Sequence, residues 1–254
     1  MAKSKIKVKT KREIEIMKEG GKKLSNIKTK LSKAIKGETD AAEIEKMANK
    51  LIEEAGGKPS FKMVAGYSWA TCINVNEGVV HGIPKKETIF SKGDIVSVDV
   101  GMFYKGFHTD TSFTVGISPS KETTFFLMSG KKALEAAIKQ ADLGSRVFDI
   151  SKAIQVSIEN SGFTPVRALV GHGIGRDLHE EPQIPCFVKG ARNRSPLLPE
   201  GAVLAIEVMY TKGTPSVTVV DDGWTIETSD GKMAGLFEET VAVTGNGPLV
   251  LTTN

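Results

Sequence analysis

Apolar positions recur at helical spacing in four segments of the chain, and the segments form two pairs. They cover residues 11–36 and 40–55, and then residues 122–140 and 146–160. Each pair is followed by short runs rich in β-branched residues, which predict strands at 71–76, 94–101, 111–116, 164–170, 202–209, 216–220 and 236–243. This order predicts two similar halves, each a helix pair followed by strands, built around one sheet system.

No run of Pro, Ser or Gly separates the two halves, so we expect one domain over residues 1–254. Pro182, Pro185, Pro196 and Pro199 instead predict a long loop in front of the next strand. These prolines therefore indicate an internal loop and not a linker between domains.

The sequence lacks the features of membrane-spanning, secreted and disulfide-rich proteins. No window approaches the roughly 18 apolar residues of a membrane span, and no apolar core of a signal peptide follows the N-terminus. Cys72 and Cys186 are too few for a disulfide framework. We expect a cytoplasmic protein without a membrane contact.

The net charge is +4, and much of it lies in a basic N-terminal segment (residues 1–11) and the residue after it. The basic residues are Lys3, Lys5, Lys7, Lys9, Lys11 and Arg12. No aromatic residue interleaves them, as base stacking would require. We therefore favour a solvated tail, or an edge strand whose lysines prevent it from pairing with another chain. The alternative is docking on a polyanion such as RNA.

Two carboxylates interrupt the strand–turn–strand pattern in the middle of the first half. Asp99 lies in the apolar run 94–101, and Asp110 lies beyond the turn that carries Lys105. Ionised carboxylates are costly in a buried sheet unless a positive charge meets them. Since Lys105 is the one basic residue nearby in the sequence, the pattern predicts a bound cation.

Glu207 and Glu238 also interrupt apolar strands, and His172 lies in a glycine-rich run. Four such carboxylates together call for about two divalent cations, and an oxygen-rich set with one histidine suits Mn, Fe(II), Co or Mg. Two ions roughly 3.5–4 Å apart can activate a water and polarise a carbonyl. Side-chain alternation prevents Glu238 and Glu239 from facing one site together, but it does not decide between them.

Two motifs surround the remaining histidines. The glycines of Gly171-His172-Gly173-Ile174-Gly175-Arg176 would let the backbone crowd a ligand, and Arg176 stands where a dinucleotide loop needs its third glycine. The run His179-Glu180-Glu181-Pro182 lacks the second histidine of a zinc-binding helix, and its proline would break a helix. Neither motif therefore indicates a dinucleotide or a zinc-helix protein.

The motifs together match one family in order along nearly the whole chain. They are Val80-His81-Gly82-Ile83-Pro84, Asp94-Ile95-Val96-x-x-Asp99, Gly106-Phe107-His108-x-Asp110-Thr111, the glycine run at 171–176, His179-Glu180-Glu181-Pro182-Gln183, Asp222-Gly223-Trp224-Thr225 and Phe237-Glu238-Glu239-Thr240. The chain resembles the type I methionine aminopeptidases of the pita-bread (creatinase/aminopeptidase) superfamily, peptidase family M24. The resemblance implies an α+β pita-bread fold, with duplicated halves around one curved antiparallel sheet.

The resemblance implies a dinuclear metalloaminopeptidase that removes the initiator methionine from nascent proteins with a small second residue. Two divalent metal ions (Co, Mn, Fe(II) or Zn) would be bound by Asp99, Asp110, His172, Glu207 and Glu238, and a metal-bridged hydroxide would attack the first peptide bond. In such sites Asp110 and Glu238 bridge the metals, and Glu207 also shuttles the proton of the water.

The resemblance also implies how the substrate is held. His179 would hydrogen-bond the scissile carbonyl, and His81 would contact the peptide nitrogen. The methionine side chain would lie against a small apolar pocket formed by Tyr67, Cys72, Leu178 and Trp224. Four departures from the family pattern stand out. Glu239 replaces a usual histidine, Leu178 a usual aromatic residue and Val208 a usual proline, and the pocket loop at residues 61–66 lacks the Tyr and His that are common there.

Two other functions stay open on the sequence. One is an X-Pro aminopeptidase or dipeptidase of the same fold, which the altered pocket loop at residues 61–66 motivates. The other is a non-catalytic relative that binds RNA or a protein. The leading interpretation predicts a monomer whose partners are the N-termini of nascent chains, with a ribosome contact through residues 1–11.

Overall fold

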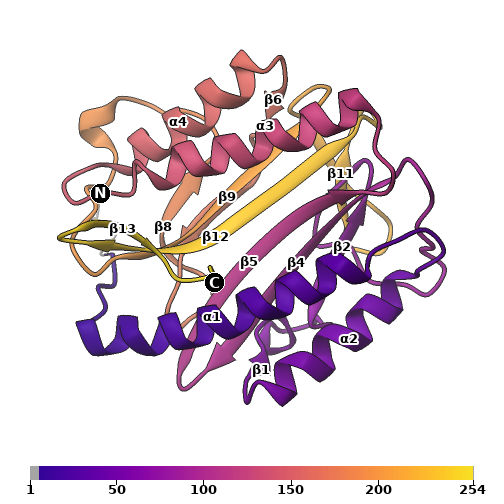
Figure 1. Cartoon of the computed structure of the whole chain (residues 1–254). Coiled ribbons are helices and arrows are strands. Elements are labelled where there is room, and N and C mark those ends of the chain that lie inside the picture. The colour runs from indigo at the N-terminus through magenta and orange to yellow at the C-terminus, as the bar shows by residue number, and fades with distance from the viewer. Residues whose placement is uncertain (1–5, 254) are drawn as a thin grey trace.

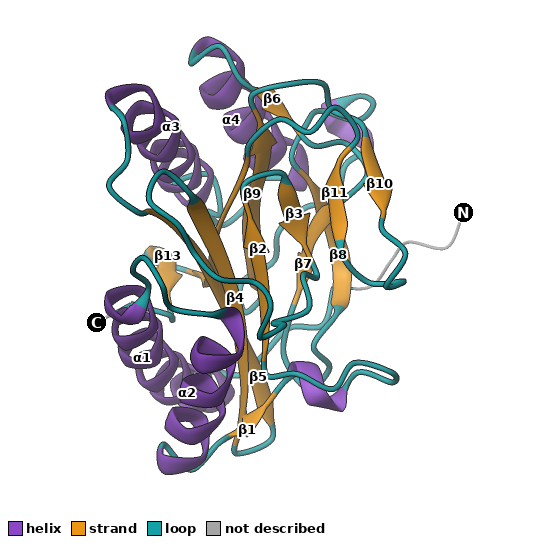
Figure 2. Cartoon of the chain, turned by 90° about the vertical axis from the view of Figure 1, so that its right-hand side faces the viewer, coloured by secondary structure: helices purple, strands orange, loops and turns teal. Residues whose placement is uncertain are grey.

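The computed structural model describes residues 6–253, and its four α-helices are those that the apolar periodicity predicts. They are α1 (Lys11–Ala34), α2 (Ala41–Glu54), α3 (Lys121–Ile138) and α4 (Val147–Asn160). In Figure 1, α1 and α2 run below the long central strands, and α3 and α4 run above them. Turned by 90°, α1, α2 and α3 lie on one side of the sheet (Figure 2).

Ten strands form one antiparallel sheet, and three form a smaller one. The strands are β1 (Lys58–Pro59), β2 (Thr71–Val75), β3 (Gly78–Val80), β4 (Ile95–Tyr104), β5 (Phe107–Gly116), β6 (Thr164–Pro165), β7 (Val170–Gly173), β8 (Glu180–Pro185), β9 (Val203–Thr211), β10 (Val217–Val219), β11 (Ile226–Thr228), β12 (Ala234–Thr244) and β13 (Gly247–Val250). The large sheet follows the order β1-β4-β5-β12-β9-β7-β8, with β2 on β4, β6 on β9 and β13 on β12. The small sheet has the order β10-β11-β3.

Each half has its own apolar core between a helix pair and the large sheet. In the first half, Leu24 and Ile44 of the helices are buried with Met102 of β4. In the second half, Phe126 of α3 packs on Tyr210 of β9, with ring centroids 4.4 Å apart. Full burial of each such large side chain contributes about 1.5–3 kcal/mol. The predicted duplication of helix pairs around one antiparallel sheet is therefore confirmed.

The prediction was wrong where short strands and prolines follow one another. The strand expected at 164–170 is interrupted, because β6 ends at Pro165 and β7 begins only at Val170. The loop expected from the prolines contains β8, which includes Pro182 and Pro185. β8 is the last strand on its side of the sheet, and proline is tolerated in such an edge strand because one of its two edges has no ladder to complete.

The basic N-terminal segment is only partly a solvated tail. Lys3 and Lys5 lie outside the described residues, and Lys7 is exposed. Lys9 is only 7% exposed, so the prediction of a solvated lysine was wrong at this position. Val8 pairs with Ala202, which brings the segment against the start of β9. Within residues 6–253, no helix has both the length and the apolar character to cross a membrane.

Candidate metal centre and substrate cavity

Strand register brings the predicted ligands of the first half to one face of the sheet. Asp99 of β4 is opposite Ser112 of β5, and Ser112 is in turn opposite Glu238 of β12. Asp110 precedes Ser112 by two residues, so its side chain points to the same face. Asp99, Asp110 and Glu238 therefore share a face on three neighbouring strands.

The second half places its two candidates on the same face. Glu207 of β9 is directly opposite Glu238 of β12. His172 of β7 is opposite Ala205, which is two residues before Glu207 and thus faces the same way. The five side chains consequently come from the consecutive strands β4, β5, β12, β9 and β7.

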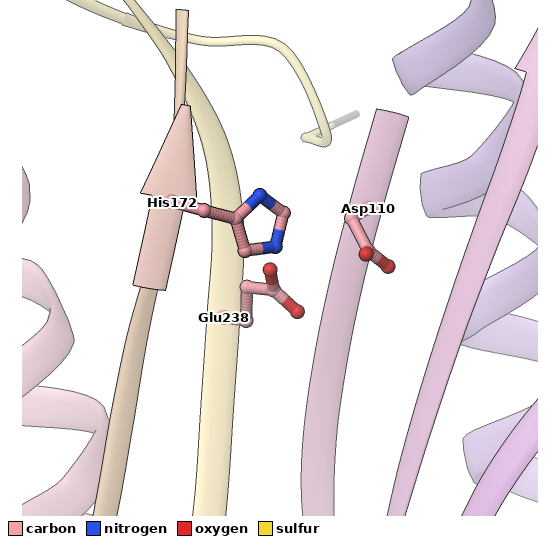
Figure 3. Close-up of side chains that lie close together, drawn as sticks. All are labelled: Asp110, His172 and Glu238. Atoms are coloured by element: carbon pink, nitrogen blue, oxygen red, sulfur yellow. The ribbon is translucent and has the colours of Figure 1, made fainter. Parts of the chain in front are cut away.

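Three of the five form a compact cluster. Asp110, His172 and Glu238 each offer a ligand atom, and these atoms lie within 4.8 Å of one another; Figure 3 shows the three strands that carry them. The Nδ1 atom of His172 lies 2.9 Å from the Gly173 carbonyl oxygen, which accepts its proton. This leaves Nε2, which lies 3.7 Å from Glu207 Oε1, with a free lone pair for a metal.

The electrostatics of the cluster favour binding of a positive charge. Burial raises the pKa of Asp99, Glu207 and Glu238 well above the usual range, and neighbouring carboxylates raise it further. Burial also raises the pKa of Asp110 to about 7 and lowers that of His172 to about 4. Within residues 6–253, none of Asp99, Asp110 and Glu238 forms an ion pair with Lys or Arg.

The hydrogen bonding of two carboxylate oxygens also favours a bound cation. Asp99 Oδ1 and Glu238 Oε1 are buried and have no hydrogen-bond partner in the described part of the chain. A buried oxygen without a partner is costly, and a divalent cation would satisfy both atoms. The donor set, carboxylates and one neutral imidazole, is one that Mn, Fe, Co or Zn accepts.

A cavity of about 140 Å³ lies over the cluster, and all the site residues expected from the sequence line it. It is lined by the five candidate ligands and by Phe61, Val64, Tyr67, Cys72, Val80, His81, Leu178, His179 and Trp224. The sequence analysis did not name Phe61, Val64 and Val80 as individual site residues. The available signals were the position of Val80 directly before His81 and the position of Phe61 and Val64 in the pocket loop at residues 61–66.

The wall of the cavity is apolar and rigid. The Tyr67 hydroxyl donates to the Thr71 carbonyl oxygen at 2.8 Å, so the ring remains as an apolar surface. Its ring meets Trp224 edge-on, with centroids 5.0 Å apart. Burial raises the pKa of the Cys72 thiol, which therefore stays neutral and behaves as a small hydrophobe. The cavity thus suits an unbranched apolar side chain.

Two histidines border the cavity beside the cluster, and both are solvent-exposed. His81 has φ +59°, a left-handed backbone conformation that is unfavourable for a residue with a side chain. The His179 ring contacts the His172 ring edge-on, with centroids 4.6 Å apart. Each imidazole is thus placed to hydrogen-bond a group bound next to the carboxylates.

Glu239 points away from this cavity, as alternation along β12 requires. Its carboxylate lies 2.5 Å from Lys28 Nζ of α1 and accepts hydrogen bonds from Thr111 and Thr252. Of the two adjacent glutamates, Glu238 therefore lies with the candidate ligands, and Glu239 joins the sheet to the helix layer.

The glycine run is packed closely against neighbouring parts of the chain. A Cβ at Gly173 would lie 2.2 Å from the Glu181 carbonyl oxygen of β8. A Cβ at Gly175 would lie 2.2 Å from Cε of Lys9. The glycines are required because the neighbouring strand and the N-terminal segment approach the backbone closely.

Comparisons with known proteins point to one family. The model of metallopeptidase family M24 matches residues 15–245. Over 248 residues the chain is 39% identical to the methionine aminopeptidase of Clostridium perfringens, covering 97% of this chain and 98% of the relative. Over 245 residues it is 40% identical to methionine aminopeptidase 1 of Bacillus subtilis, covering 96% and 98%.

Solved structures agree with the sequence matches. The crystal structure of a methionine aminopeptidase from Thermotoga maritima superposes with a TM-score of 0.95 at 40% identity, covering 98% of this chain and 100% of that one. A prolidase from Pyrococcus furiosus shares the fold, with a TM-score of 0.77 at 23% identity, and the chain covers 65% of it. The predicted pita-bread fold is thereby confirmed.

Proposed function

Because the chain belongs to metallopeptidase family M24, we propose that it is a metal-dependent aminopeptidase that removes the initiator methionine from nascent chains with a small second residue. The observation that carries this proposal is the cavity, in which a cluster of carboxylates and His172 adjoins an apolar wall. The same site thus offers metal ligands and room for a thioether side chain.

We assign two divalent cations to Asp99, Asp110, His172, Glu207 and Glu238. Four carboxylates carry about four negative charges, which two such cations balance. Asp110 and Glu238 lie on the two central strands, between Asp99 on one side and Glu207 and His172 on the other, so both would take part in holding the cations. When bound, the metals would polarise the scissile carbonyl and lower the pKa of the attacking water.

The remaining side chains would orient the peptide and move its protons. The methionine side chain would enter the cavity between Tyr67, Trp224 and Leu178. The His179 imidazole would donate a hydrogen bond to the carbonyl oxygen as negative charge develops there. Glu207 would take a proton from the attacking water, and His81 would assist its delivery to the departing amine.

The alternatives from the sequence are not favoured. The prolidase neighbours show the fold alone at 23% identity or less, whereas full-length relatives at about 40% identity are methionine aminopeptidases. A non-catalytic relative would have no need for unpaired buried carboxylates around a cavity. The substrate partners are therefore the N-termini of nascent chains.

A ribosome contact through residues 1–11 stays a prediction, but Lys9 is not available for it. Its ammonium is buried against Glu180, and Lys7 is paired with Asp177. Such a contact would depend on Lys3 and Lys5, outside the described residues, and on the exposed Lys11. Removal of residues 1–5 is therefore a cleaner test of docking than removal of the whole segment.

Substrate preference tests the proposal. Purified protein reconstituted with Co(II) or Mn(II) should release Met from Met-Ala-Ser, with kcat/KM at least 100-fold above that for Leu-Ala-Ser or Ala-Pro-Ser. The branched Leu side chain should fit the cavity poorly, and the Ala side chain of the Ala-Pro peptide should leave most of the cavity unfilled. Faster cleavage of the Ala-Pro peptide would move the protein to the X-Pro branch of the family.

A further inference from the structure

Three ion pairs tie the loop at residues 174–180 to the start of the chain, two through the N-terminal segment and one through Glu13 in the first turn of α1. Their N–O distances are 2.5 Å for Lys7–Asp177, 2.6 Å for Lys9–Glu180 and 2.7 Å for Arg176–Glu13. Two of them involve exposed partners, for which solvent screening leaves little net stabilisation. The Lys9–Glu180 pair differs, because the two side chains are only 5% and 1% exposed.

Both members of the buried pair form further hydrogen bonds. Lys9 Nζ donates to the Lys7 carbonyl oxygen at 3.0 Å as well as to Glu180 Oε2. The other Glu180 oxygen, Oε1, accepts from the backbone N–H groups of Arg176 at 3.0 Å and Asp177 at 3.3 Å. Glu180 therefore closes the loop on itself, and Lys9 holds Glu180 in place.

The start of the loop is fixed independently of this pair. The Ile174 N–H donates to the Val203 carbonyl oxygen at 3.0 Å, and the His108 N–H donates to the Gly175 carbonyl oxygen at 2.7 Å. Two groups support the stretch from Arg176 to His179 from within the loop: the side chain of Glu180, and the Gly175 N–H, which donates to the Asp177 carbonyl oxygen at 3.1 Å. Lys9 reaches Glu180 by passing beside Gly175, where a Cβ would leave no room for it.

This loop carries two residues of the cavity. Leu178 lines the apolar wall, and His179, which directly precedes Glu180, lies beside the candidate ligands. A shift of the turn would therefore move the imidazole relative to the scissile carbonyl. Misplacement of a catalytic group by about 1 Å can cost about 100-fold in rate.

We propose that Lys9 is a positioning residue: its ion pair with Glu180 fixes the loop at 174–180 and holds His179 in register with the metal centre. The inference rests on the proposed function, because it assigns His179 to the scissile carbonyl. It makes the N-terminal segment a part of the active-site scaffold. Burial lowers the pKa of Lys9, and the Glu180 carboxylate opposes that effect.

The first test compares Lys9→Met with Lys7→Met. Methionine keeps an unbranched apolar stem beside Gly175 but leaves Glu180 buried without its partner. We expect Lys9→Met to lower kcat for Met-Ala-Ser by 10- to 100-fold with KM within about 3-fold, because the carbonyl contact matters most in the transition state. Lys7→Met, which removes an exposed pair, should stay within about 2-fold.

A double-mutant cycle separates positioning from simple anchoring. In a His179→Ala background, Lys9→Met should cost less than about 3-fold in kcat, because the group it positions is gone. If Lys9→Met lowers kcat by 10- to 100-fold in that background as well, the inference is overturned. Unchanged kcat in Lys9→Met, with His179→Ala impaired, would overturn the positioning role alone; unchanged kcat in His179→Ala would overturn the proposed role of His179 as well.

A second variant covers the case in which Lys9→Met folds poorly. Lys9→Met combined with Glu180→Gln removes both buried charges, and the glutamine oxygen can still accept from the Arg176 and Asp177 N–H groups. We expect this variant to recover the thermal midpoint of the wild-type protein, read by circular dichroism, while kcat stays at least 5-fold low. Recovery of kcat together with the midpoint would show that the pair is only structural.

Discussion

Glu238 and Glu239 are adjacent in β12, yet their surroundings are opposite. Glu238 is 2% exposed, beside Asp110 and His172, with one oxygen unpartnered. Glu239 is held by Lys28 and two threonine hydroxyls on the other face. The two positions therefore offer matched variants that differ in which face of one strand they change.

Glu238→Gln should weaken Mn(II) binding by more than 10-fold and Met release by more than 100-fold, because it removes a ligand charge. Glu239→Gln should keep Mn(II) affinity within about 3-fold but lower the free energy of unfolding by about 1–3 kcal/mol, since Lys28 loses its ionic partner. Isothermal titration and urea denaturation measure the two effects. Loss of metal binding in Glu239→Gln alone would contradict the assignment of the two faces.

Residue chemistry explains which parts of the site could be predicted from the sequence. Carboxylates inside apolar strands, such as Asp99 and Glu207, stand out because burial without a counter-charge is so unfavourable. The pocket residues Tyr67 and Cys72 do not stand out, since an aromatic or a thiol in a core needs no ligand to explain it. Those two positions came from the resemblance to a family.

At the scale of elements, long periodic segments were predictable and short ones were not. The helix α1 and the strand β4 carry enough apolar repeats to define their type. The strands β6, β7 and β8 are short and contain Gly or Pro, and they are strands because the sheet provides partners for them. Tertiary pairing overrides local propensity there.

The N-terminal segment shows the same limit. Lys9 pairs with a residue 171 positions away, so no local pattern in the sequence indicates that Lys9 is buried. A run of alternating lysines is typical of a solvated surface, and only the arrangement of β9 and the loop at 174–180 makes Lys9, the second described lysine of the run, an interior residue. Its role depends on packing between elements that are distant in the sequence.

At the scale of the whole molecule, the candidate metal centre lies where the two halves meet. β4 and β5 of the first half supply Asp99 and Asp110, and β7, β9 and β12 of the second half supply the other three candidates. The halves join through the pairing of β5 with β12. Bound metals would thus cross-link the halves and stabilise the fold, by about 2.7 kcal/mol at a free concentration 100 times Kd.

Without metals, the same carboxylates should make stability depend on pH. Burial raises the pKa of Asp110 to about 7 and that of Asp99, Glu207 and Glu238 well above the usual range. Above the unfolded carboxyl pKa of about 4, the folded state therefore binds more protons than the unfolded state, and stability falls as pH rises.

The fall in the stability of the metal-free protein with rising pH should be clearest between about pH 6.5 and 8. Below that range the lowered pKa of His172 acts in the opposite direction, because the unfolded chain then takes up the proton. Each raised carboxyl removes up to about 1.4 kcal/mol per pH unit until it ionises. Urea denaturation in a chelator, with a metal-saturated control that lacks the fall, measures this. A flat or rising profile for the metal-free protein would contradict the burial of these charges.

The most direct test of the metal centre is a titration of metal-free protein with Mn(II), in which bound metal and the rate of Met release from Met-Ala-Ser are measured in the same samples. The wild-type protein should gain activity as metal binds, with up to two ions per chain. His172→Ala should bind metal more weakly and release Met at least 100-fold more slowly. Full activity in the chelated wild type, or in His172→Ala, would contradict the account.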